Sequence, residues 1–373
     1  MAEKHKFVML DGLRGIAAIA VVLFHRRWWF ADDGGFLQHA PLAVDFFFLL
    51  SGFVIAYAYE PKLIAGMSLR RFLIKRLIRL YPLIILGAFL GGAFILLKEI
   101  RNEGRIADTI EITLFGIAAI PMPFPNSIAN QPFYADQPLW SIFFELLVNI
   151  GFAAFLYRLT NSSLKLIVVF TAVVYLIAVA VKGDFGLIGN QYGPYGWMLL
   201  AGLPRTACSF FLGVIIFRRL GDSWISRVRA PAWTLPVILI AIFAVPDLGN
   251  IGNTIMAALS VLIVFPLIVI TGANAQLDGV GAKIAAISGA VSFPIYVLHE
   301  PMYAWSDPLM YRLGLFDQVV PSVLSCAHVF GIAVFSLIVY KIYDIPIRRF
   351  LTSTFDTSKQ ATPACDGSLH DRA

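Results

Sequence analysis

The apolar run DGLRGIAAIAVVLFH near the start of the chain carries ionisable side chains on one helical face. Arg14 and His25 are eleven residues apart. Eleven residues of α-helix return a side chain to within about 20° of its first direction and advance it by about 16 Å. Asp11, three residues before Arg14, lies on a neighbouring strip of that face. The segment therefore presents a carboxylate, a guanidinium and an imidazole, groups that bind anions or move protons.

Other ionisable residues also interrupt apolar segments. Because charge within a membrane is costly, such residues mark function by default, although an ion pair that only holds helices together is an equally good explanation for any one of them. If the apolar segments are membrane-spanning helices and the chain begins in the cytoplasm, six of these side chains should converge at a similar depth near the outer surface of the membrane. They are His25, Asp45, Glu145, Arg205, His299 and Glu300.

A dense basic run, RRFLIKRLIRLYP, precedes another apolar segment. It contains Arg70, Arg71, Lys75, Arg76 and Arg79. These cations could anchor the chain at the cytoplasmic lipid headgroups. They could instead hold the phosphates of a polyanionic cytoplasmic ligand.

The composition excludes several protein classes. The chain of 373 residues is 59% hydrophobic and 14% charged, and its mean hydropathy is +0.78, whereas soluble domains carry about 25% charged residues. A soluble enzyme, a secreted disulfide scaffold and a disordered chain are therefore excluded. The net charge of +6 fits loops at a membrane surface, so no nucleic-acid partner is expected. Three scattered cysteines predict neither a disulfide framework nor a metal site.

The hydropathy pattern predicts an all-α integral membrane protein with about ten spanning helices. Residues 1–350 would form one transmembrane domain, and residues 351–373 a short, disordered polar tail. With both termini in the cytoplasm, most loop Lys and Arg residues lie on the cytoplasmic side. The stretch Ile110–Met122 is too short for a span and suggests a re-entrant or interfacial segment. The predicted spans are 8–28, 41–59, 80–97, 139–157, 163–182, 202–219, 231–246, 253–271, 284–304 and 319–343.

Five segments in order resemble acyltransferase family 3, membrane enzymes that O-acylate bacterial surface glycans. The first is LDGLRGIAAIAVVLFH, which holds Arg14 and His25, and the second is VDFFFLLSGFVIAY. The third is the arginine-x-x-arginine-x-x-proline element at Arg76, Arg79 and Pro82. The last two are PLWSIFFELL and SFPIYVLHEP. The family often has a second acidic residue after the position of Glu145, where this chain has Leu146, so we expect Glu145 to act alone.

The resemblance implies a multi-pass protein of the inner membrane. It also implies a cytoplasmic acyl-CoA donor, usually acetyl-CoA, as co-substrate, with no permanently bound cofactor. The acceptor would be a carbohydrate hydroxyl, on a glycan that could be lipid-linked. A transporter or flippase, or a structural subunit of a polysaccharide assembly complex, is the alternative that the charged residues alone allow.

Roles for the candidate residues follow from this resemblance and from their chemistry. We expect His25 to remove the proton of the acceptor hydroxyl, or to become transiently acylated. Glu145 or Asp45 could orient His25, while Arg14 could pair with Asp11 or stabilise negative charge. The donor phosphates would bind Arg71, Lys75, Arg76 and Arg79. Substrate would be bound or oriented by Asp11, Asp45, Trp140, Ser141, Arg205, His299 and Glu300.

Overall fold

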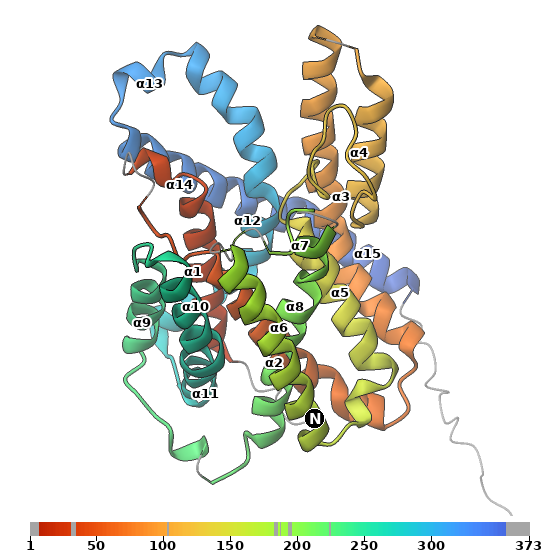
Figure 1. Ribbon diagram of the computed structural model, residues 1–373, viewed down its shortest axis with the longest axis vertical. Helices are drawn as coiled ribbons and strands as arrows, with labels where there is room; N and C mark the ends of the chain where they lie inside the picture. Colours follow the sequence, from red (N-terminus) through yellow and green to blue (C-terminus); the bar gives the residue numbers. More distant parts are fainter. Residues whose placement is uncertain are drawn as a thin grey trace, which may run out of the picture.

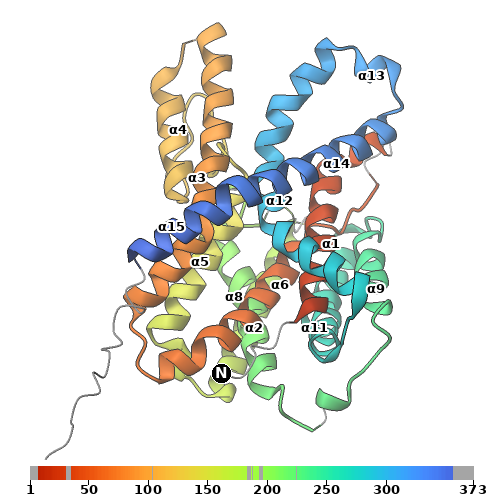
Figure 2. The ribbon, with the colours of Figure 1, turned by 180° about the vertical axis from the view of Figure 1, so that it is seen from behind.

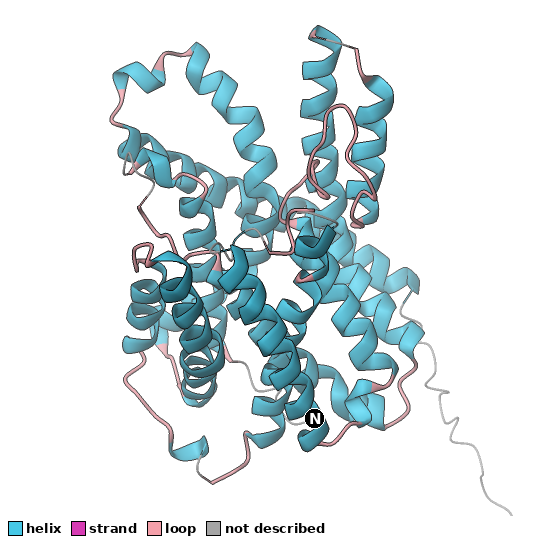
Figure 3. Cartoon of the chain, in the orientation of Figure 1, coloured by secondary structure: helices cyan, strands magenta, loops and turns pink. Residues whose placement is uncertain are grey.

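The computed structural model describes residues 7–30, 35–102, 104–182, 186, 188–192, 196–223 and 225–355. These residues form helices joined by loops, without a strand among them (Figures 1 and 3). The longer helices are α1 (Val8–Phe24), α2 (Leu42–Ile64), α3 (Leu69–Arg101), α4 (Ile106–Ala118), α5 (Leu139–Ala154), α6 (Asn161–Lys182), α8 (Gly202–Arg219), α9 (Thr234–Phe243), α10 (Gly249–Leu259), α11 (Phe265–Asn274), α12 (Gly279–Arg312), α14 (Pro321–Val339) and α15 (Ile345–Phe355).

Short elements complete the described chain. Two four-residue helices, α7 (Trp197–Leu200) and α13 (Leu315–Gln318), precede α8 and α14. Two π-helical turns, Ser260–Val264 and Tyr340–Asp344, join α10 to α11 and α14 to α15 without a break. Figure 2 shows α14 and α15 as one long rod that crosses α12 and α3.

Seven helical stretches among the described residues are long and apolar enough to cross a membrane. Helices α5 and α9 are apolar but shorter, and α1 has 17 residues. Each of the ten predicted spans overlaps at least one of these helices. The helical, multi-pass character is confirmed, whereas the count of ten spans and the orientation of the termini stay predictions. The seven stretches are Leu42–Ile64, Leu69–Arg101, Asn161–Lys182, Trp197–Arg219, Gly249–Asn274, Gly279–Arg312 and Pro321–Phe355.

Two predicted boundaries differ from the observed helices. The short apolar stretch that begins at Ile110 belongs to α4, a helix of 13 residues that packs against α3 and ends where Ala119 takes a left-handed conformation. The predicted tail from residue 351 begins inside α15, because that helix continues to Phe355. The remainder of the tail, residues 356–373, lies outside the described residues.

Small residues allow the central helices to approach closely. A Cβ atom on Gly15 of α1 would lie 1.6 Å from Ser288 Oγ of α12. A Cβ atom on Gly52 of α2 would lie 1.9 Å from the carbonyl oxygen of Phe210 in α8. Such contacts are typical of helix pairs in membranes. They bring the end of α1 to the middle of α12, and α2 to α8 (Figure 1).

A fully buried ion pair joins α2 to α8. Arg205 Nη2 donates to Asp45 Oδ2 over 2.7 Å, and neither side chain is exposed. The same guanidinium donates to the backbone carbonyls of Pro41 and Ile188. Because its hydrogen bonds are largely satisfied, this pair can exist in a low-dielectric interior.

Breaking this pair should destabilise the protein more than breaking an exposed one. In Arg205→Met the Asp45 charge stays buried without its partner, and we expect a loss of about 3 to 5 kcal/mol in the free energy of unfolding. Unfolding by sodium dodecyl sulfate in mixed micelles measures it. Arg219→Met, at the last residue of α8, removes the exposed partner of Asp222 and should cost less than about 1 kcal/mol. Equal losses of unfolding free energy in the two variants would contradict the conclusion that the buried pair stabilises the contact between α2 and α8.

Candidate active site

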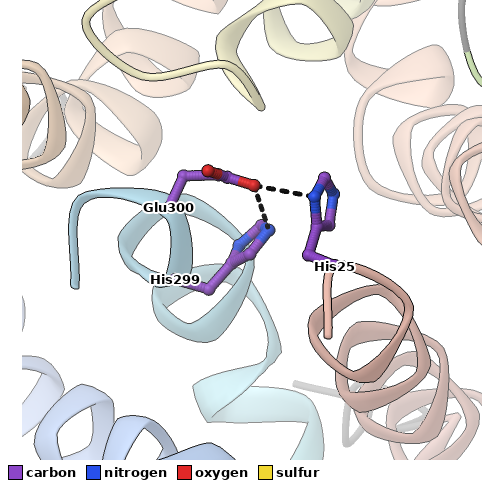
Figure 4. Close-up of side chains that lie close together, drawn as sticks. All are labelled: His25, His299 and Glu300. Carbon is purple, nitrogen blue, oxygen red and sulfur yellow. Dashed lines mark ion pairs between the residues drawn. The ribbon is translucent and has the colours of Figure 1, made fainter. Parts of the chain in front are cut away.

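An imidazole and a carboxylate from two helices meet at the end of α1. His25 follows α1 directly, and Glu300 lies in α12. His25 Nδ1 is 2.7 Å from Glu300 Oε1 (Figure 4). An Nδ1–H that donates to this carboxylate leaves the lone pair on Nε2 free to accept a proton. Both side chains are partly exposed, at 29% for His25 and 26% for Glu300, so the pair is accessible to a substrate.

His299 completes this group from the interior. Its side chain is fully buried, and its Nδ1 lies 2.7 Å from the carbonyl oxygen of Tyr296. Its ring centroid is 5.1 Å from that of His25, and its Nε2 is 4.0 Å from Glu300 Oε1. The two histidines and Glu300 therefore form one cluster, which we call the histidine cluster.

The histidine cluster also has the ligand types of a metal site. One atom from each of its three residues lies within 4.8 Å of the others, and two histidines with one carboxylate can bind zinc. Neither the cysteines nor any other spacing in the sequence predicted such a site. The same His25–Glu300 contact would also orient an imidazole base, and the effect of EDTA on activity distinguishes the two roles.

A second charged cluster lies at the level of Arg14, which is eleven residues before His25 on α1. Arg76 Nη2 donates to Glu145 Oε1 over 2.8 Å, and Ser51 Oγ donates to the same oxygen over 2.6 Å. Arg14 lies 3.9 Å from Asp11. A cavity of about 150 Å³ is lined by three guanidinium groups and one carboxylate. We call it the arginine cavity, after Arg14, Arg76 and Arg79.

The expected convergence of six ionisable groups at one depth is therefore wrong for Glu145. Trp140, near the start of α5, contacts the ring of Phe48, three residues below Asp45 on α2. Helix α5 thus begins about one turn deeper than α2. Glu145 consequently bonds Ser51, about 9 Å further along α2 than Asp45. The carboxylate that contacts His25 is that of Glu300.

The other candidate residues take distinct positions. Asp45 and Arg205 bind each other in the interior, and the Trp140 ring centroid is 5.2 Å from the guanidinium carbon. Ser141 Oγ is 2.8 Å from the hydroxyl of Tyr296. On α3, Arg71 is exposed, and neither it nor Lys75 is among the described residues that line the arginine cavity.

A second cavity, of about 200 Å³, lies beside the histidine cluster. His25, His299 and Arg205 line it, and we call it the histidine cavity. Val44 and Tyr296 line both this cavity and the arginine cavity. The two cavities are therefore adjacent, and the side chains of Val44 and Tyr296 lie between them. Sequence reasoning missed Tyr296, although it lies in the segment SFPIYVLHEP, three residues before His299.

The chain is similar to known proteins over most of its length. Residues 7–341 match the acyltransferase family 3 model, whose description is "Acyltransferase domain". No solved structure matches the chain.

Three relatives illustrate the similarity. "Protein 2 in picA locus" from Rhizobium radiobacter is 37% identical over 47% of this chain and 95% of its own length. "Acyltransferase MdmB" from Streptomyces mycarofaciens is 32% identical over 41% of this chain and 40% of its own length. "Putative O-acetyltransferase SACOL0978" from Staphylococcus aureus (strain COL) is 33% identical over 29% of this chain and 17% of its own length. Because the family match covers most of the chain, from residue 7 to residue 341, the protein belongs to acyltransferase family 3.

Proposed function

We propose that this acyltransferase moves an acyl group, most simply acetyl, from acyl-CoA to a hydroxyl group of a carbohydrate. The observation that carries the proposal is the His25–Glu300 contact beside a cavity that adjoins a second, arginine-lined cavity. The His25–Glu300 contact can activate a hydroxyl, and the arginine cavity can hold an anionic donor. The name of the Staphylococcus aureus relative supports acetyl as the group transferred to oxygen.

The proposed reaction is a direct displacement at the thioester carbon. His25 Nε2 accepts the hydroxyl proton as the hydroxyl oxygen attacks the acyl carbon. The bond between that carbon and sulfur then breaks, and the thiolate leaves as CoA after receiving a proton. Glu300 keeps Nδ1 protonated and stabilises the imidazolium that forms during the attack. A transient acyl group on His25 would give the same products through two displacements.

The arginine cavity suits the donor. Arg14, Arg76 and Arg79 line it, and arginine forks bind phosphate through paired hydrogen bonds. The acyl end of the donor would then reach His25 by passing between Val44 and Tyr296, which line both cavities. This path requires the arginine cavity to face the cytoplasm and the histidine cluster to face the outer side of an inner membrane, with both termini cytoplasmic.

Family membership favours this enzyme over the transporter that the charged residues alone would allow. A transporter would move its substrate without breaking the thioester. Release of CoA together with acylated carbohydrate by the purified protein therefore distinguishes the two functions.

Replacing His25 tests the base directly. In His25→Ala we expect acyl transfer to fall by at least about 100-fold, because the group that accepts the hydroxyl proton is lost. The rate is measured with acetyl-CoA and the surface carbohydrate of cells that produce the protein. The control is His39→Ala, since His39 is a buried loop histidine that contacts the carbonyl of Val245 and does not belong to the histidine cluster. Near-normal acyl transfer by correctly inserted His25→Ala would contradict the assignment of His25 as the base.

The same assay decides between a base and a metal ligand at His25. With His25 as a base, EDTA should leave wild-type transfer unchanged. Activity that is lost in EDTA and restored by zinc would instead assign the histidine cluster to a metal-bound nucleophile or Lewis acid.

Replacing Arg79 tests the donor site. Arg79→Gln removes one of the three guanidinium groups of the arginine cavity, so we expect the Kd for acetyl-CoA to rise about tenfold or more. Equilibrium binding of labelled acetyl-CoA to the protein in nanodiscs measures it. Arg101→Gln, at the other, exposed end of α3, should leave the Kd unchanged. If both variants bind the donor as tightly as wild type, the basic run serves as a membrane anchor.

A further inference from the structure

A third cavity, of about 260 Å³, lies between α3, the loop before α5 and α12. It is larger than the arginine and histidine cavities. Its polar lining includes three carboxylates and one amine. We call it the acidic cavity, after Glu99, Asp136 and Glu300; the amine is that of Lys98.

Two of these carboxylates are buried with unused hydrogen-bond acceptors. Asp136 is 1% exposed, and neither of its oxygens has a partner within the described part of the chain. Glu99 is 7% exposed, and its Oε2 is likewise without a described partner. Burying an unsatisfied carboxylate is costly. A ligand that donates hydrogen bonds in this cavity would remove that cost.

The fold makes room for Asp136 through two glycines of α3. A Cβ atom on Gly87 would lie 2.5 Å from Asp136 Oδ2, and one on Gly91 would lie 1.7 Å from the carbonyl oxygen of Ala135. The loop can therefore lie against α3 only where that helix lacks side chains. This close packing holds the Asp136 carboxylate beside the helix and inside the cavity lining.

The acidic cavity borders the histidine cluster. Glu300 lines the acidic cavity and also contacts His25. Gln137 lines both the acidic cavity and the histidine cavity. Its side-chain amide donates a hydrogen bond to Gln131, which also lines the acidic cavity. A group bound in the acidic cavity would thus lie next to the imidazole that activates a hydroxyl in the proposed reaction.

The chemistry of the lining selects a class of ligand. Carboxylate oxygens accept hydrogen bonds, so they suit the hydroxyl donors of a sugar. The side chains of Phe94 and Tyr134 add aromatic surface to the same lining, against which the apolar face of a sugar ring can pack. Burial and the neighbouring Glu300 already raise the pKa of Asp136 well above its usual range, so the further carboxylate of an acidic sugar is disfavoured in this poorly hydrated cavity.

We propose that the acidic cavity is the acceptor site and that it binds a neutral, hydroxyl-rich sugar through Glu99 and Asp136. This inference rests on the proposed function and adds the class of acceptor and two binding residues that contact it.

Matched acceptors test the inference. The full-length protein in nanodiscs is given acetyl-CoA with either methyl glucoside or methyl glucuronide, which differ in one carboxylate. CoA release and mass spectrometry of the glycoside report donor turnover and transfer separately. We expect kcat/KM for the glucoside to exceed that for the glucuronide by about tenfold or more.

Two variants connect this selectivity to the cavity. Glu99→Gln and Asp136→Asn should each raise the KM for methyl glucoside by about 10- to 100-fold, since each replaces a carboxylate oxygen that accepts a sugar hydroxyl with an amide group. Each should also narrow the preference for the neutral sugar, while the KM for acetyl-CoA stays unchanged. The control is Glu111→Gln, an exposed glutamate of α4 that bonds Asn126, which should alter none of these constants.

The outcomes separate the two proposals. Wild-type protein that releases no CoA with any acceptor contradicts the proposed function. CoA release without acylated glycoside, equal use of the two glycosides, or an unchanged acceptor KM in both variants overturns the acidic cavity as the acceptor site.

Discussion

The close packing of α1 against α12 is the constraint on which the site depends. Gly15 of α1 lies where a side chain would collide with Ser288, and Gly289 of α12 lies where one would collide with Asp11. With these glycines the two helices can touch backbone to backbone, as small residues permit in membranes. The same contact brings His25, at the end of α1, to Glu300 of α12. A larger residue at either position would separate the imidazole from its carboxylate.

The charged residues of this apolar protein differ in how completely each is paired. Asp45 and Arg205 neutralise each other in full burial and join α2 to α8. Glu145 balances one of three arginines beside a cavity, which leaves that cavity an excess of positive charge. Glu99 and Asp136 keep buried oxygens without a described partner. Guanidinium groups thus gather around one cavity and carboxyl groups around another, and Glu300 of the histidine cluster lines the second. This distribution suits the anionic acyl-CoA in the arginine cavity and a neutral sugar, whose hydroxyl groups donate hydrogen bonds, in the acidic cavity.

Sequence reasoning predicted the helices and the shared face of Arg14 and His25 because helical periodicity is local. It placed Glu145 wrongly, because the depth of a residue depends on where its helix begins, and α5 starts about one turn deeper than α2. Asp136 was missed because a lone aspartate in a polar loop looks solvated. Its burial depends on contact with Gly87, far away in the sequence.

The central claim is that the His25–Glu300 pair activates the acceptor hydroxyl. A single-turnover experiment measures this step directly: enzyme loaded with labelled acetyl-CoA is mixed with acceptor carbohydrate, and the appearance of acylated product is followed. In Glu300→Gln the imidazole loses the carboxylate that orients it. The account predicts that the rate of this step falls at least about tenfold, with the Kd for acetyl-CoA unchanged. A wild-type rate in this variant would contradict the account.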